Sequence, residues 1–259
     1  MNFFIMVSLI LSVLLGIFRG IDLALLTDAE TGLCIVGSVW LRYGALAVAV
    51  GAAVAAGRGG QPKPDALRGH CTPSGVVALA AAVCYGEAAV LRILWMHSSV
   101  VMLLRAVLEA LCAFWMIGLG LSWLRRGWKN PTRSLTPAVL GSVIFYWCVL
   151  ARFMENSSSW HRVTPTAAVW QALAALVFLA ALARALHVPQ PGNGKTLCAA
   201  GLAAFALCLC WQLPHVLVLM SGLSWAALAV WPEIFAGLGL CCVGGIGGAC
   251  VTACLNGES

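Results

Sequence analysis

The sequence predicts an all-α fold, a polytopic transmembrane helical bundle of about eight spans with both termini in the cytoplasm. Hydrophobic residues make up 62% of the 259-residue chain and charged residues only 9%, and the mean hydropathy is +0.96. Apolar runs of about 20 residues, long enough to cross the hydrocarbon of a bilayer, recur along the chain. Backbone groups in lipid must be bonded internally, and these runs do not alternate strictly, so helices are favoured over a β-barrel.

Each apolar run corresponds to one expected span. The expected spans are Asn2–Leu26, Leu33–Ala56, Gly75–Met96, Ser99–Trp123, Thr136–Met154, Thr166–Leu186, Thr196–Met220 and Ser224–Cys254. The last run is too long for one straight helix, and Pro232 interrupts its backbone ladder. One interpretation is an interfacial or re-entrant piece over Ser224–Trp231 followed by a span from Glu233; seven spans or nine segments are alternatives.

No polar stretch is long enough to form a water-soluble module, so residues 1–259 are expected to form a single integral membrane domain. Basic residues collect in alternate loops, which the positive-inside rule places in the cytoplasm. They are Arg58, Lys63, Arg68, Arg125, Arg126, Lys129, Arg133 and Lys195. The protein is therefore expected in the cytoplasmic membrane. The same rule accounts for the loop part of the net charge of +6, so no nucleic-acid partner is expected.

Charged side chains inside apolar runs are the main functional signal, because a charge in hydrocarbon costs roughly 2.5–3.5 kcal/mol on insertion scales. The candidate ligand-binding residues are Arg19, Asp22, Arg42, Glu87, Arg105, Glu109, His215 and Glu233. Most of the charged ones fall in the outer half of their span. They predict a polar cavity open to the outside, in which Arg42 and Arg105 hold an anionic group. Glu87 or Glu109 would exchange a proton or balance the arginines.

The alternative for these charges is a buried ion-pair network that fixes helix packing. Arg92 and Arg152 approach the outer ends of their spans, so they are expected to extend to the interface and are left out of the site.

A second candidate combines two groups: Gln212, Pro214 and His215 in the seventh span, and Trp231, Pro232 and Glu233 in the eighth. Prolines free backbone carbonyls that transporters use to hold ions or substrates. The alternative is an ordinary proline kink with a polar residue filling the gap.

Two pairs of glycines, Gly16 with Gly20 and Gly244 with Gly248, match the small-residue pattern of closely packed membrane helices. These glycines are expected to allow close helix packing within the bundle. For Gly244 and Gly248, the alternative is contact with a helix of a partner. The twelve cysteines are expected to be mostly free thiols acting as small apolar residues.

No motif for a nucleophile, a metal or haem is present, so an enzyme is the less favoured class and no metal or cofactor is expected. The leading hypothesis is binding or transport of a small polar or anionic solute. The alternative is a non-transporting sensor or an assembly partner of another membrane protein. The expected partners are thus the lipid bilayer, a small solute and a second helix.

Overall fold

The computed structural model describes residues 3–27, 34–59, 67, 69–95, 99–125, 135–154, 163–188, 190, 192–221 and 228–256. Within these ranges the regular elements are all helical, and eight helices are long and apolar enough to cross a membrane. The predicted all-α class and number of spans are therefore confirmed, and the chain is a multi-pass membrane protein.

The elements follow one another as a chain of antiparallel helices. They are α1 (Phe3–Ile21), η1 (Asp22–Leu26), α2 (Val39–Gly59), α3 (Thr72–Trp95), α4 (Val100–Leu124), α5 (Thr136–Met154), α6 (Val163–His187), α7 (Asn193–Ala204), η3 (Phe205–Trp211), α8 (Gln212–Ser221), η4 (Leu228–Val230) and α9 (Trp231–Asn256). Here η1 and η3 are π-helical, so α1 with η1 makes one span and α7, η3 and α8 make another.

Two predicted span boundaries are corrected. The second span begins at Val39 rather than Leu33, because Gly37 adopts a positive φ of 88° just before it. The last span begins at Trp231, and Pro232 lies in its first turn. A proline fits there, since the first backbone N–H groups of a helix have no partner within it. Pro232 therefore starts α9 rather than breaking it; Ser224–Ala227 lie outside the described residues.

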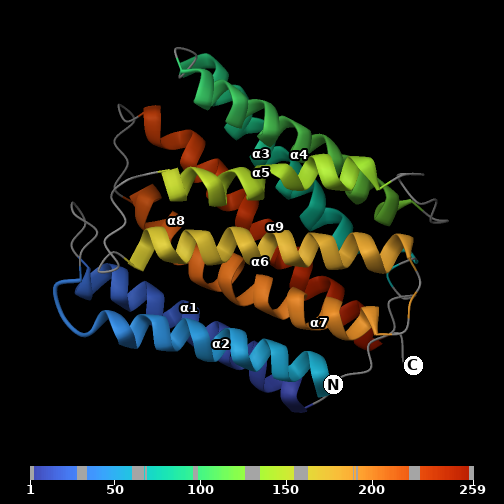
Figure 1. The fold of residues 1–259 in the computed structure, drawn as a ribbon, viewed down its shortest axis with the longest axis horizontal. Coiled ribbons are helices and arrows are strands. Elements are labelled where there is room, and N and C mark those ends of the chain that lie inside the picture. Colours follow the sequence, from blue (N-terminus) through green and yellow to red (C-terminus); the bar gives the residue numbers. More distant parts are fainter. Residues whose placement is uncertain are drawn as a thin grey trace.

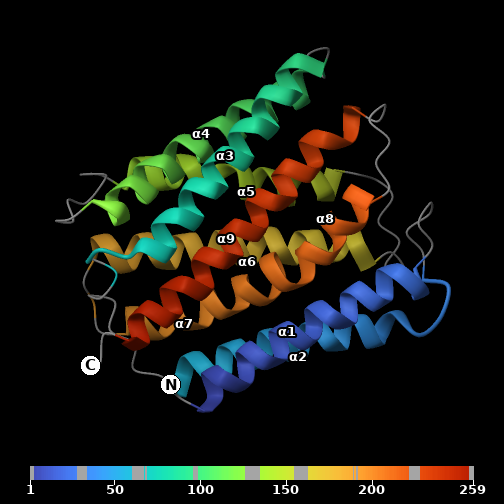
Figure 2. The same cartoon turned by 180° about the vertical axis from the view of Figure 1, so that it is seen from behind.

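The helices form one bundle with both termini at the same end (Figure 1). Helices α3 and α4 lie along one edge, α1 and α2 lie along the other, and α6, α7 and α9 run between them (Figures 1 and 2). The opposite end, where α1, α3 and α5 end and α2, α4, α6 and α9 begin, is called the distal end below.

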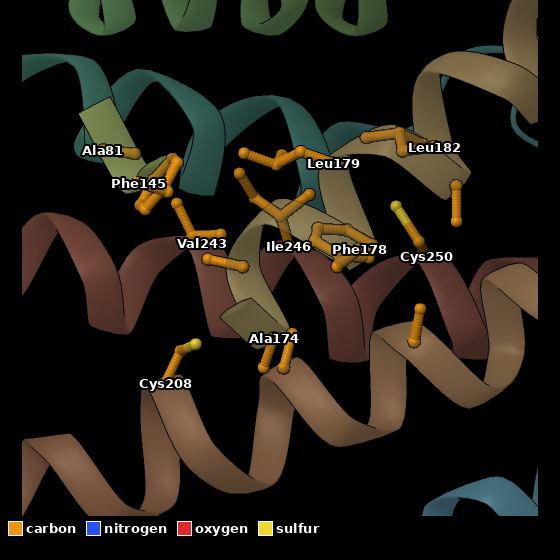
Figure 3. Packing of buried hydrophobic residues seen from close by; sticks show 14 of the residues in the cluster. Ala81, Phe145, Ala174, Phe178, Leu179, Leu182, Cys208, Val243, Ile246 and Cys250 are labelled. Atoms are coloured by element: carbon orange, nitrogen blue, oxygen red, sulfur yellow. The ribbon is translucent and has the colours of Figure 1, made fainter. Parts of the chain in front are cut away.

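The centre of the bundle is built on α6 and α9. Residues buried inside the chain make up 61% of the most apolar stretch of α9, against 28% for α1. Figure 3 shows Phe178 and Leu179 of α6 packed against Val243 and Ile246 of α9. All twelve cysteines are free, as expected for most of them, and several, such as Cys208, are small core residues.

Glycines set how closely α9 approaches its neighbours. A Cβ atom on Gly244 would lie 2.6 Å from the Leu209 nitrogen, and one on Gly248 would lie 2.7 Å from the Phe205 ring. On α1, a Cβ atom on Gly16 would lie 2.8 Å from the Cys210 carbonyl oxygen. These positions therefore pack against η3 within the chain.

Four basic residues of the described part lie exposed at the end that holds the termini. They are Arg58, Arg125, Arg184 and Lys195. The other loop residues used to predict the orientation, Lys63, Arg68, Arg126, Lys129 and Arg133, lie outside the described residues.

Replacing Gly244 by valine should destabilise the bundle by about 1–3 kcal/mol or more, because the added atoms meet backbone that cannot move aside. The measurement is thermal unfolding of the purified protein in detergent. Gly51→Val on α2 is the matched control, since a Cβ atom there meets nothing within 4 Å. Equal unfolding temperatures for the two variants would contradict the packing argument.

Candidate functional site

Asp22 joins three helices through two buried arginines, a group called the Asp22 network below. Its carboxylate accepts hydrogen bonds from Arg19 Nη1 at 2.6 Å and from Arg42 Nε at 2.8 Å, with a further short contact to Arg42 Nη2. Arg19 Nη2 donates to Thr164 Oγ1 at 3.0 Å. The two arginines and Asp22 are at most 2% exposed. The network therefore ties α1 and η1 to α2 and α6.

Local structure brings these side chains together. Arg19 and Asp22 are three residues apart and share a helix face. Arg42 lies in the first turn of α2, and besides Asp22 it donates to the carbonyls of Leu26 at 3.4 Å and Val36 at 3.3 Å. It thereby satisfies backbone acceptors at the end of η1 and shortly before α2.

A second network, called the Glu109 network, joins α3, α4 and α9. Arg92 Nε donates to Glu109 Oε2 at 2.9 Å, and Arg92 Nη2 donates to Glu233 Oε1 at 3.0 Å. Arg105 donates to Glu109 through Nε at 3.2 Å and to Glu233 through Nη2 at 2.9 Å. Each carboxylate therefore bridges two arginines.

The Glu109 network has a dry side and a wet side. Arg92 and Glu109 are at most 1% exposed, whereas Arg105 is 23% and Glu233 46% exposed. Ion pairs in water contribute little to stability, while a buried one is costly to break. The Arg105–Glu233 pair can therefore open at far smaller cost than the Arg92–Glu109 pair.

The structure corrects two expectations on α3. Arg92 does not extend to the interface; it is buried in the Glu109 network. Glu87, expected to line the cavity with Glu109, is exposed and lies outside both networks. Ala81, Ala88 and Tyr85 mark the packed face, which leads to Arg92 and turns Glu87 outward. The small residues of that face are the sequence signal that distinguishes the buried position of Arg92 from the exposed position of Glu87.

A cavity of about 360 Å³ lies between the two networks in the distal half of the bundle. Arg19 and Thr164 border it on one side, and Arg105, Glu109 and Glu233 border it on the other. Its remaining polar walls and its aromatic walls come from α3, α5, α6, η3 and α8. These residues include Arg152, Gln171, Gln212, His215, Tyr85, Phe145, Trp147 and Trp211.

Positive charge exceeds negative charge among the described residues that line this cavity. Its charged lining residues are the arginines Arg19, Arg105 and Arg152 and the glutamates Glu109 and Glu233. The Arg19 guanidinium also lies 4.6 Å from the centroid of the Trp211 ring, a cation–π contact. The arrangement favours an anionic ligand over a cationic one.

The second predicted candidate, around Pro214, lies on the same cavity. Gln212 and His215 line it, and Gln171 of α6 donates from Nε2 to both the Leu207 carbonyl oxygen and Gln212 Oε1, each at 2.9 Å. Leu207 belongs to the π-helix η3, and such distortions are frequent at functional sites. Gln171 therefore satisfies a backbone acceptor of the π-helical segment.

Seven of the eight residues chosen from the sequence gather at this site. Arg19, Arg105, Glu109, His215 and Glu233 line the cavity, and Asp22 and Arg42 lie directly behind Arg19.

Sequence reasoning missed Thr164, Gln171 and Trp211, and it wrongly left out Arg152, which lines the cavity. Gln171 carries a signal in the sequence, because it is a lone amide within an apolar run. Thr164 carries none, because threonine is common near span ends, and Trp211 carries none, because an aromatic residue inside a span is usually a core residue.

Comparisons with known proteins add no family: no protein-family model matches the chain, and neither a curated protein nor a solved structure matches it. In the described ranges, no three His, Cys, Asp or Glu side chains form a group that could hold a metal ion. The function is therefore argued from the geometry of the cavity.

Replacing Asp22 by asparagine should lower the free energy of unfolding by about 3–5 kcal/mol, because two buried arginines lose their counter-ion. Thermal unfolding in detergent measures the loss. Glu87→Gln removes a carboxylate that makes no ion pair with the described residues, so this matched control should unfold like the wild type. If both variants unfold alike, the Asp22 network does not hold the helices together.

Proposed function

We propose that this protein binds a small anionic solute in the cavity between the two networks and carries it across the cytoplasmic membrane. The observation that supports the proposal most directly is the excess of arginine around a cavity buried among spanning helices. Ionisable residues within membrane spans commonly mark the path of a substrate or an ion.

The cavity limits the size and chemistry of the solute. A volume of about 360 Å³ suits a small organic ion. Arginine guanidinium groups match carboxylate and phosphate oxygens, and the rings of Phe145, Trp147 and Trp211 favour a compact apolar part. A carboxylate or phosphate ester with a short apolar body fits both requirements.

The two networks would then have different tasks. Arg19 is held in place by Asp22, Thr164 and the Trp211 ring, so it presents a fixed charge. Arg105 shares the exposed carboxylate of Glu233, and an arriving anion would compete with that carboxylate for its guanidinium. Glu109 balances the charge of Arg92 beneath them and keeps the site occupied by ion pairs when no solute is bound.

Movement of the solute requires a part of the bundle that changes shape. The span Asn193–Ser221 borders the cavity and contains both the π-helix η3 and Pro214. Interrupted helices next to the binding site are typical of secondary transporters. We assign the hinge to this span.

The positive-inside rule supports the direction of opening. The exposed basic residues Arg58, Arg125, Arg184 and Lys195 lie at the end with the termini, away from the cavity. The termini would then be cytoplasmic, and the cavity would open to the outside. A sensor that binds the same anion without moving it is the alternative, and uptake into proteoliposomes separates the two.

Access and charge preference can be measured at Cys148, which lines the cavity. In intact cells, an anionic methanethiosulfonate reagent should modify Cys148 about tenfold faster than a cationic one, because positive potential concentrates anions. Each rate is divided by that of the same reagent at Ser221→Cys, an exposed site at the distal end, and mass spectrometry quantifies the Cys148 peptide. Equal relative rates, or modification only from the cytoplasmic side, would contradict the proposal.

The solute itself is found by screening small carboxylates and phosphate esters for those that slow modification of Cys148. For such an anion, Arg105→Ala should weaken protection and uptake about tenfold or more, as expected for the loss of a charged hydrogen-bond donor. Expression should be unchanged, since Arg105 is partly exposed.

Arg184→Ala is the matched control, because this exposed arginine lies at the other end of the bundle. A different outcome refutes the binding role: Arg105→Ala fails to fold while the apolar pair Arg105→Leu with Glu233→Leu folds normally. The Glu109 network would then only hold the helices together.

A further inference from the structure

The outward face of α3 carries a carboxylate far from both membrane surfaces. Glu87 is exposed and makes no hydrogen bond or ion pair with the described residues. At 1.5 Å per residue it lies ~12 Å from Trp95 at the distal end of α3 and ~22 Å from Thr72 at the other end. It therefore faces the hydrocarbon near the middle of the span.

This placement differs from that of every other charged side chain in the described helices. The other exposed charges lie within three residues of a helix end: Arg58, Arg152, Arg184, Lys195 and Glu233. The charges deeper in the spans, such as Asp22 and Glu109, are buried in the two networks. Charged groups in membrane spans face a partner or a water-filled cavity, and Glu87 has neither among the described residues.

The residues around Glu87 form a seam suited to a second helix. Counting along α3, one row of its exposed side chains follows in steps of four and three, the spacing of a helix–helix interface. These residues are Val76, Ala80, Val83, Glu87, Val90 and Leu94, called the Glu87 face below. Helix α3 lies along an edge of the bundle, with α4 and α9 against its other sides, so a further helix can approach its outward face (Figure 2).

Exposure alone does not explain a carboxylate on this face. The exposed side chains of the neighbouring α4 include Leu103, Val107, Phe114 and Ile117, and none of its exposed positions is charged. Those of α1 are likewise apolar over its whole length. The Glu87 face thus differs from the exposed faces of α1 and α4 in carrying a carboxylate, and a basic side chain at the same depth would be its counter-ion.

We infer that the Glu87 face binds a spanning helix of another membrane protein that carries arginine, lysine or histidine at the depth of Glu87. A second copy of this chain is a poor complement, because the arginines within its described spans are either paired in the two networks or lie within three residues of a helix end. Two copies meeting through this face would oppose one glutamate to the other. The required cation must come from a different protein.

This inference does not depend on the proposed function. The Glu87 face points away from the cavity, and none of its residues lines the cavity. A transporter with an accessory subunit and a sensor with a signalling partner would both use it. Failure of the anion-binding tests would therefore not contradict the inference about the Glu87 face. Failure of the crosslinking test would equally not contradict anion binding in the cavity.

Photocrosslinking in the cells that produce the protein tests the inference. A photoreactive phenylalanine derivative replaces Val83 or Val90 in the full-length chain, and Val13 on the exposed face of α1 serves as the control position. The expected result is an adduct to another protein from α3 alone. Its attachment site should lie within one helical turn of an arginine, lysine or histidine in a spanning segment.

Variants of Glu87 test whether the partner helix binds through the charge of Glu87 or is merely close to α3. Glu87→Leu and Glu87→Gln should each reduce the adduct about tenfold, as expected for an interhelical polar contact worth 1–2 kcal/mol, while Glu87→Asp retains it. Glu87→Arg combined with an acidic replacement of the partner's basic residue should restore it. Unfolding temperatures equal to the wild type show that the variants are folded.

Four results would overturn the inference. They are an adduct only to a second copy, no protein adduct from either position on α3, a partner segment without a nearby basic residue, and a yield that Glu87→Leu leaves unchanged.

Discussion

Pairing of buried arginines with carboxylates in the distal half of the bundle is the interaction on which the rest of this structure depends. Hydrocarbon provides no solvent for a lone charge, so each charged residue must find its counterpart on another helix. Asp22 thereby joins α1, α2 and α6, and Glu109 joins α3, α4 and α9. The depth and rotation of these helices follow from that pairing, and the cavity is the space left between the two networks.

Packing along α9 beyond Glu233 relies on small apolar residues and not on ion pairs. Along α9, glycines such as Gly244 and Gly247 let backbones touch without any polar contact. Helices in lipid gain little from burying apolar surface, so close packing of small residues replaces the hydrophobic driving force of soluble proteins. The bundle thus combines a tight half, near the termini, with an open and charged half at the distal end.

Sequence patterns predicted much of this because each rests on a local property. The length of an apolar run measures the thickness of the bilayer, and the eight spans follow. A charge within such a run must be accommodated, and all of the predicted site residues except Glu87 gather at the cavity or behind it. The choice between Glu87 and Arg92 failed, since depth can be counted along the chain but the rotation of α3 about its axis depends on its neighbours.

The sequence by itself determined the number of spans, the all-helical class and the cost of the intramembrane charges, because hydropathy and helix length act within one segment. Only the tertiary structure decided which charges meet. Each arginine had several carboxylates at a comparable depth, and contacts such as Arg92 with Glu233 join residues 141 positions apart. That choice depends on which helices become neighbours. The same neighbours decided that Glu87 faces outward, since α4 and α9 pack against the other sides of α3.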